Sequence, residues 1–388
     1  MSASAAKWNY PTKILFGAGR IAELAAACRE TGISRPLLVT DAGLAKLPMV
    51  AETMALLAKE GVPAKLFSDI KPNPIAANVE AGVAAFRDGG HDGVIAFGGG
   101  SGLDAGKLVA FMAGQTRPIW DFEDIGDWWS RANADTIAPI VAVPTTAGTG
   151  SEVGRAAVVT DEAAHMKKII FHPKMLPGVV IADPLLTVGL PKPVTAATGM
   201  DAFAHCMEAY CAPGYHPMAD GIAMEGLRLI AEWLPVAYES PENVEARGHM
   251  MAAASMGATA FQKGLGAVHS LAHPLGALYD AHHGLLNAIL MPYVMIRNRP
   301  AIEGRMDRLA RYLGLEGQGF DAVLAWLLGL RRRLGIPETL SAIGIKADRA
   351  EEIGRLAEND PSTPTNAVPV TAADLSAIFR RAVAGDVS

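Results

Sequence analysis

Cysteine is scarce in this sequence, and the few residues present form no pattern. Cys28, Cys206 and Cys211 are the complete set among 388 residues, and neither their odd number nor their spacing builds a disulfide framework. A low, unpaired cysteine content is typical of proteins in a reducing compartment, so we expect a cytoplasmic protein.

Long apolar runs are absent as well. Residues 1–12 lack the apolar core of a signal peptide, so none is predicted. Elsewhere no apolar stretch reaches the roughly 18 to 20 residues of a membrane-spanning helix without a charge, a proline or a glycine cluster. We therefore expect no membrane partner.

The third absence is a concentration of positive charge. The formal net charge is -6, and the densest basic run, Arg331–Arg333, is interpreted as a solvated helix end that the helix dipole favours. Binding to nucleic acid requires a concentrated basic surface, so nucleic acid is not expected as a partner.

Half of the residues are apolar, which is enough for a sizeable core, and the length favours two domains. The first half alternates short apolar runs with helical patterns. We expect strands at 36–40, 64–67, 93–97 and 140–143, and helices at 44–60 and 75–88. This alternation predicts an α/β domain over residues 1–185, in which a mostly parallel sheet carries helices on its faces.

The second half, residues 186–388, shows few strand-like runs and is predicted to be all-helical. We expect helices at 196–212, 218–238, 243–261, 302–313, 321–334 and 371–383, separated by short breaks that contain glycine or proline.

A glycine-rich loop, Gly98–Lys107, follows the expected strand at 93–97 and opens a helix. Glycines let the backbone approach a pyrophosphate closely, and the helix N-terminus adds unpaired N–H groups and positive partial charge. The loop therefore indicates a dinucleotide site, although a tight turn without a ligand is the alternative. Its spacing departs from the Walker pattern, so a nucleotide-hydrolysing P-loop is not predicted.

Two further segments suit the same cofactor. Asp41 directly follows the strand at 36–40, where a carboxylate can accept hydrogen bonds from a ribose diol and repel a 2′-phosphate. This favours NAD over NADP, while a helix N-cap is the alternative role. The loop Pro144–Glu152 is dense in hydroxyls and backbone donors, which suits a phosphate or a ribose unless the segment is a plain turn.

Half of the histidines fall in three short segments of the second half. Asp201 and His205 are four residues apart in a helical stretch, so both side chains share one face. His269 and His273 form a second pair with this spacing. Buried core histidines are the alternative, but an Asp/His helix pair with further histidines in an apolar helical domain favours a metal site.

Nitrogen and oxygen ligands without thiolate suit Fe(II) or Zn(II), and a set that leaves coordination positions open is typical of a catalytic site. Spacing alone does not choose between His269 and His273, or between the adjacent His282 and His283.

Together these motifs resemble the iron-containing (group III) alcohol dehydrogenases over nearly the full length. The resemblance rests on the glycine loop, the loop at 144–152, Pro72–Pro74, which fits the family's Pro-Asn-Pro turn, and the two metal motifs. It implies a dehydroquinate synthase-like fold, with an α/β N-terminal dinucleotide-binding domain and an all-helical C-terminal metal-binding domain.

By position, the resemblance implies that the metal ligands are Asp201, His205, His269 and His283. It leaves His273 beside the ligands as a candidate catalytic residue that relays a proton. The cofactor-binding positions that it implies are Asp41, Asn73, Gly99, Gly100, Ser101, Asp104, Thr145, Thr146, Thr149 and Lys167, of which Lys167 has a lysine neighbour in Lys168.

The resemblance also implies an activity. The metal, Fe(II) or alternatively Zn(II), would act as a Lewis acid on the substrate oxygen, and NAD would exchange hydride with a small alcohol, aldehyde or ketone. The family implies a homodimer or a larger homo-oligomer.

The same fold also serves NAD- and metal-dependent lyases and cyclases that act on a phosphorylated, highly polar acid. Such a substrate needs clustered basic side chains, but between Asp201 and His283 only Arg228, Arg247 and Lys263 occur. We therefore expect a small, uncharged substrate. A non-catalytic assembly protein is a third interpretation, against which the intact metal and cofactor motifs argue.

Overall fold

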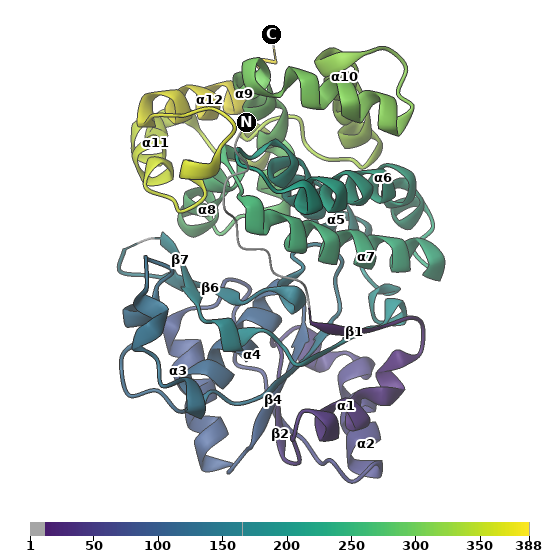
Figure 1. Ribbon diagram of the computed structural model, residues 1–388, viewed down its shortest axis with the longest axis vertical. Coiled ribbons are helices and arrows are strands. Elements are labelled where there is room, and N and C mark those ends of the chain that lie inside the picture. Colours follow the sequence, from purple (N-terminus) through teal and green to yellow (C-terminus); the bar gives the residue numbers. More distant parts are fainter. Residues whose placement is uncertain (1–11, 165, 388) are drawn as a thin grey trace. The chain divides into compact units, whose positions relative to one another are not determined.

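The computed structural model describes residues 12–164 and 166–387 (Figure 1). The chain folds into two compact units, an α/β unit that ends at Gly189 and a helical unit whose main part begins at Leu190. Residues 1–11, on which nearly all of the signal-peptide expectation rests, lie outside the described part.

The α/β unit contains a parallel sheet of six strands in the order β1-β8-β5-β4-β2-β3. Two further strands form an antiparallel hairpin. The sequence analysis anticipated neither this hairpin nor the two sheet strands at Lys13–Phe16 and Val179–Ala182. The strands of the sheet are β1 (Lys13–Phe16), β2 (Pro36–Val39), β3 (Lys65–Phe67), β4 (Gly93–Gly98), β5 (Ile140–Pro144) and β8 (Val179–Ala182), and those of the hairpin are β6 (Ala156–Asp161) and β7 (Met166–Phe171).

Helices cover both faces of this sheet. Because successive side chains of a strand point to opposite faces, Ile95 and Phe97 of β4 pack against α1 (Leu24–Glu30) and α2 (Pro48–Lys59). On the other face α4 (Gly100–Met112) lies against Ala96 and packs beside α3 (Ala76–Asp88). The helix expected at 44–60 is divided, since Pro48 starts α2 after a short 3-10 turn.

The strand order places the reversal of the winding between β2 and β4. The chain leaves β2 for β3 on one side, whereas it leaves β4 for β5 on the other. Ligands of doubly wound sheets bind at the carboxyl ends of the strands at such a point. Asp41 follows β2 closely and the glycine loop continues from β4, so both lie at this end.

The helical unit contains α5 (Lys192–Cys211), α6 (Pro217–Glu239), α7 (Val244–Ala260), α8 (Ala267–Tyr279), α9 (His283–Leu313), α10 (Gly319–Arg333), α11 (Ala350–Glu358) and α12 (Ala372–Ala384). The sequence analysis missed α8, α11 and the first 19 residues of α9. Pro274 lies inside α8, and Pro292 and Pro300 lie inside α9, and prolines interrupt the helical pattern on which such predictions depend.

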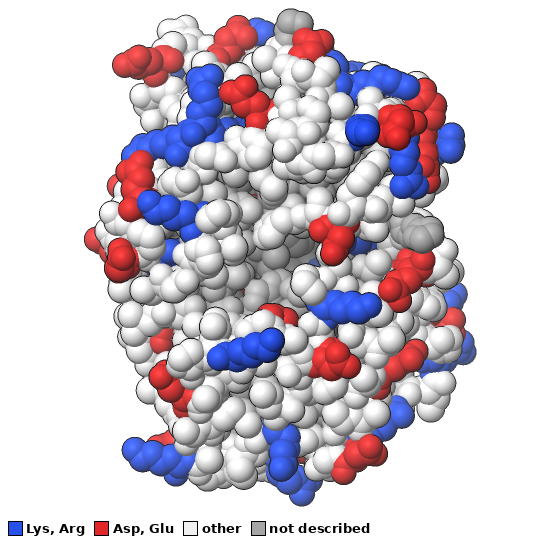
Figure 2. Space-filling view, turned by 180° about the vertical axis from the view of Figure 1, so that it is seen from behind, with Lys and Arg blue, Asp and Glu red and all other residues white. Residues whose placement is uncertain are grey.

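Among the described residues, no helix combines the length and the apolar character needed to cross a membrane. On the face drawn in Figure 2, Lys and Arg side chains alternate with Asp and Glu, and blue atoms do not merge into one area.

Candidate metal centre and cofactor loops

Two loops lie side by side at the carboxyl ends of β4 and β5. These strands pair in parallel with Gly98 opposite Pro144, and the Thr145 N–H donates to the Gly98 carbonyl at 2.9 Å. A Cβ on Gly100 would come within 2.6 Å of the Thr149 methyl group. Glycine is therefore required at this position, because it lets the hydroxyl-rich loop approach the N-terminus of α4.

Asp104 and Lys107, both in α4, connect this helix to the loop that follows β5 and to the start of the hairpin. The Asp104 carboxylate accepts from the Ser151 hydroxyl at 2.5 Å and from the Val158 N–H at 3.0 Å, so both of its oxygens are engaged within the protein. The Lys107 amine, only 1% exposed, donates to the carbonyls of Ser151 (2.9 Å) and Ala156. Burial lowers the pKa of Lys107, which Asp104 opposes from 3.4 Å.

The Pro-Asn-Pro turn joins the same region. The Ser101 hydroxyl donates to the carbonyl of Pro72, which brings Asn73 beside the glycine loop. In the hairpin, Lys168 forms an ion pair with Asp161 at 3.2 Å and a second ion pair with Glu123. Lys167 is its neighbour in β7 and points to the opposite face of the strand.

Asp41 does act as a cap. Its Oδ1 accepts from the N–H groups of Gly43 and Leu44, both at 2.9 Å, which stabilises the turn that follows β2. One carboxylate oxygen accounts for both bonds. The capping and ribose-binding roles are therefore compatible, since the Asp41 Oδ2 takes no part in the cap.

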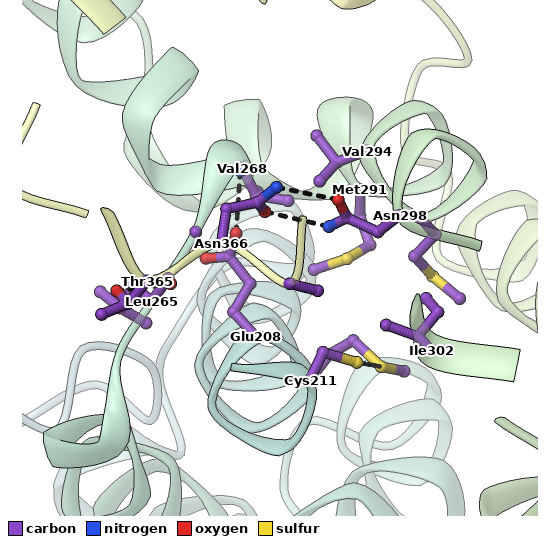
Figure 3. A pocket seen from close by; sticks show the side chains of 14 residues that line it. Glu208, Cys211, Leu265, Val268, Met291, Val294, Asn298, Ile302, Thr365 and Asn366 are labelled. Atoms are coloured by element: carbon purple, nitrogen blue, oxygen red, sulfur yellow. Dashed lines mark hydrogen bonds between the residues drawn. The ribbon is translucent and has the colours of Figure 1, made fainter. Parts of the chain in front are cut away.

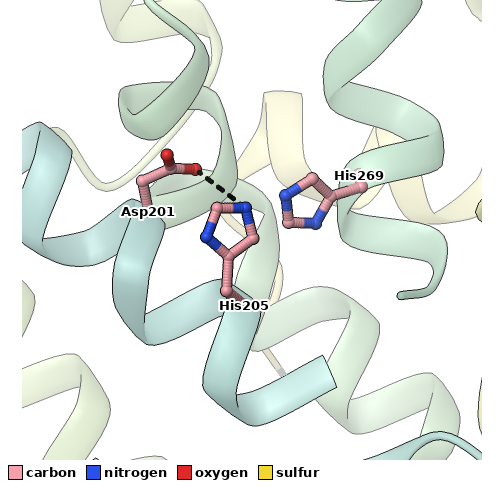
Figure 4. A group of neighbouring side chains, drawn as sticks. All are labelled: Asp201, His205 and His269. Carbon is pink, nitrogen blue, oxygen red and sulfur yellow. Dashed lines mark ion pairs between the residues drawn. The ribbon is translucent and has the colours of Figure 1, made fainter. Parts of the chain in front are cut away.

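The predicted metal ligands converge in the helical unit. Asp201 and His205 lie on one face of α5, a helix whose middle is buried on all sides, and they point toward His269 of α8 (Figure 4). The candidate donor atoms of these three residues lie within 4.8 Å of one another. His283, at the start of α9, places its Nε2 3.6 Å from the Asp201 Oδ1.

This arrangement fits a divalent ion. Donor atoms around a tetrahedral ion with bonds of about 2.1 Å are about 3.4 Å apart. The Asp201 Oδ1 lies 3.9 Å from the His205 Nε2 and 3.6 Å from the His283 Nε2, so small side-chain shifts suffice. The His283 side chain is 24% exposed, against 7% or less for the other three, so solvent reaches the cluster from its side.

Thiolates do not compete with these ligands. Cys206 and Cys211 belong to the same helix as Asp201, but burial raises the pKa of both thiols to about 12. Neither thiol belongs to the described group of side chains whose donor atoms come together, so the donors of this group are nitrogen and oxygen.

Glu208 orients His269, and the sequence analysis missed it. The His269 Nδ1 donates to the Glu208 Oε2 at 2.5 Å, and both side chains are buried. Burial opposes a charged ring, but the carboxylates of Glu208 and Asp201 outweigh it and hold the pKa of His269 above its ordinary value. A signal was present, since Glu208 follows Asp201 by seven residues and His205 by three, on the same helix face.

Asn287 is a second residue that was missed. It is fully buried, and its Nδ2 donates to the Asp201 Oδ1 at 2.8 Å. The same nitrogen lies 3.3 Å from the His269 Nε2 and 3.2 Å from the His283 Nε2. Three of the predicted ligand atoms thus face one side-chain amide, which follows His283 by one helical turn of α9.

His273 lies against the cluster. Its ring stacks on His283, with 5.3 Å between ring centroids, and its Nδ1 donates to the Asp360 Oδ2 at 2.7 Å. Burial raises the pKa of Asp360, but the interaction with His273 outweighs it and the pKa is lowered. Asp360 comes from a segment 87 residues away, which spacing could not reveal.

Comparisons with known proteins show the family of this chain. Family models described as "Iron-containing alcohol dehydrogenase" and "Fe-containing alcohol dehydrogenase family, C-terminal" match residues 11–184 and 195–383. The chain belongs to the iron-containing alcohol dehydrogenase family. As a member, this dehydrogenase is an NAD-dependent oxidoreductase that acts on alcohols, and the family uses iron.

Individual relatives span the whole chain. A 4-hydroxybutyrate dehydrogenase of Cupriavidus necator is 39% identical over 94% of this chain and 96% of its own length. An NAD-dependent methanol dehydrogenase of Bacillus methanolicus is 33% identical, covering 96% of this chain and 98% of its own. The crystal structure of a 1,3-propanediol oxidoreductase superposes with a TM-score of 0.92 at 35% identity, covering 97% of this chain and all of the other.

The basic side chains that lie between Asp201 and His283 in the sequence argue against the lyase alternative. Arg228 and Lys263 lie in ion pairs at 2.6 and 2.5 Å. Arg247 is buried and donates to the Thr195 hydroxyl at 2.8 Å. All three cations in this stretch of the sequence are therefore engaged within the protein, which agrees with the expectation of an uncharged substrate.

Replacing Asp41 by Asn tests its role toward the cofactor. The amide oxygen can still cap the following turn, while the negative charge that repels a 2′-phosphate is lost. We expect the preference for NAD over NADP, measured as the ratio of kcat/KM values, to fall about 10-fold, or about 1.4 kcal/mol. Asp41→Gly removes cap and charge together and serves as comparison. An unchanged preference in both variants would mean that Asp41 does not face the ribose.

Proposed function

We propose that Asp201, His205, His269 and His283 hold the iron of this dehydrogenase. The observation that carries the proposal is that the donor atoms of Asp201, His205 and His269 lie within 4.8 Å of one another, while the His283 Nε2 lies 3.6 Å from the Asp201 Oδ1. The uneven exposure supports an open coordination position on the side of His283.

Iron held by these residues would supply Lewis-acid polarisation of an alcohol oxygen, and NAD in the cofactor site would supply the hydride acceptor. The protein prepares the site for both. Glu208 keeps the proton of His269 on Nδ1, so that the Nε2 lone pair remains for the metal. His273, held at Nδ1 by Asp360, accepts the alcohol proton at Nε2 and passes it toward solvent.

We further propose that residues 1–185 form the dinucleotide-binding domain and residues 186–388 the metal-binding domain. Within the first, the strand ends around the winding reversal supply the contacts to NAD. Asp104 is engaged at both oxygens and acts on the cofactor through the loop that it holds. The remaining positions proposed to contact NAD are Asp41, Asn73, Gly99, Gly100, Ser101, Thr145, Thr146, Thr149 and Lys167.

The proposed substrate is a small, uncharged alcohol or its carbonyl product. The protein itself engages Arg228, Arg247 and Lys263, which leaves those three cations committed elsewhere. A carboxylate such as that of 4-hydroxybutyrate, the substrate in the name of one relative, would need a cation to bind it. We also propose a cytoplasmic location, because the cysteine content is low and unpaired. The family resemblance supports a homodimer or a larger homo-oligomer.

Loss of one ligand tests the metal site. We expect His269→Ala and His283→Ala to lose bound iron and turnover together, with at least a 100-fold drop in kcat/KM, about 2.7 kcal/mol. Metal content by elemental analysis and NADH formation at 340 nm measure the two. His249→Ala is the matched control, since His249 stacks on Trp233 in the same unit. Full activity of a metal-free His269→Ala protein would contradict the proposal.

A substrate panel tests the substrate class. Protein stripped of metal is reloaded anaerobically with Fe(II) or Zn(II) and assayed with 1-butanol, 1,3-propanediol and 4-hydroxybutyrate. We expect the uncharged alcohols to give kcat/KM values at least 10-fold above that of the carboxylate. A preference for 4-hydroxybutyrate would overturn the uncharged-substrate proposal but leave the dehydrogenase assignment intact.

A further inference from the structure

Helix α8, which carries His269, starts without a cap of its own. The first N–H groups of a helix have no partners within the helix, and a side chain just before it usually accepts from them. Here that position is Gly266, which has no side chain. Two residues far away in sequence supply the oxygens instead.

Glu208 and Asn366 take the place of the missing cap. The Val268 N–H donates to the Glu208 Oε1 at 2.8 Å (Figure 3). The Ala267 N–H donates to the Asn366 Oδ1 at 3.1 Å. The two acceptors are 60 and 99 residues from their donors.

Gly266 makes room for both acceptors. A Cβ at this position would lie 2.7 Å from the Asn366 Oδ1 and 3.0 Å from the Glu208 Oε1. The backbone of Gly266 is extended, with φ of -161°, a conformation open to any residue. The glycine is therefore needed for the close approach of these two side chains and not for its backbone conformation.

Asn366 also connects α8 to α9, the helix that carries His283. Its amide forms a reciprocal pair with Asn298, with bonds of 3.0 and 2.8 Å, and Figure 3 shows the two amides face to face. The neighbouring Thr365 hydroxyl donates to the Leu265 carbonyl at 2.9 Å. The segment that contains Asn366 thus contacts both helices that supply single metal ligands.

We infer that Asn366 is a positioning residue of the metal centre, which acts by capping α8 jointly with Glu208. Glu208 serves two functions at once, because its other oxygen accepts from the His269 Nδ1. The cap fixes where α8 starts relative to α5 and α9, and so fixes the place of His269. Groups that hydrogen-bond a ligand directly, as Glu208 does, change metal affinity by about 10- to 100-fold when they are removed. Asn366 acts one step further away, through the start of the helix that Glu208 also caps.

Co(II) provides a test that does not depend on turnover, because its visible absorption reports the coordination geometry. In Gly266→Ala the added methyl group displaces both acceptors while it deletes no polar group. In Asn366→Ala one acceptor is lost. We expect Co(II) affinity, measured by competition with a chelator, to fall at least 10-fold in each variant, with an altered visible spectrum.

The matched controls are Gly329→Ala, where a Cβ would meet nothing within 4 Å, and Asn359→Ala, an exposed asparagine of the same connection. Both should keep wild-type affinity and spectrum. In a double variant that combines Gly266→Ala with Asn366→Ala, the added methyl group should lower Co(II) affinity by less than Gly266→Ala does alone. One of the two side chains that it displaces has already been removed.

The inference rests on the proposed metal site, and the experiment distinguishes failure of the metal-site proposal from failure of the role inferred for Asn366. If wild-type protein does not bind Co(II), the metal-site proposal is wrong. If wild-type binds Co(II) and both variants match their controls, Asn366 does not position the ligands and the inference is overturned. Loss of helical circular dichroism in both variants would also overturn it, because the cap would then support the whole unit and not the metal centre.

Discussion

The carboxylate of Asp201 lies on a helix that is buried on all sides, and a buried charge is costly unless other groups compensate it. The surrounding residues supply that compensation. Asn287 donates to Asp201, two imidazole nitrogens lie within 4 Å, and a divalent cation at their common point would complete the balance. The proposed metal binding and the stability of the helical unit therefore depend on the same few contacts.

Two buried carboxylates hold the histidine rings of this cluster in place. Glu208 and Asp360 each accept from the Nδ1 of a histidine, and each is itself buried. Because a neutral imidazole carries its proton on one nitrogen only, these contacts determine which nitrogen faces the cluster. The orientation of both rings is thus set by carboxylates on α5 and on the segment before α12, and not by α8 itself.

Local patterns in the sequence predicted what depends on local structure. The glycine loop after β4 and the pairing of Asp201 with His205 depend on neighbours a few residues apart, and spacing revealed both. The choice of His269 and His283 came from the family resemblance, since spacing left two candidates for each. Glu208 shares a helix face with Asp201 and His205 and could have been found from its spacing. Asn366 could not, because its partner Ala267 is 99 residues away, and α8 was missed because Pro274 interrupts its pattern.

The Lys107 amine links α4, the loop after β5 and the start of the hairpin, and it does so in the interior of the α/β unit. Segments tied in this way cannot move independently, so the loops proposed to contact NAD are already ordered before it arrives. A ligand that finds its loops ordered loses less conformational entropy on binding, and more of its contact energy appears as affinity. A single buried cation thus acts as preorganisation for a cofactor that it does not touch.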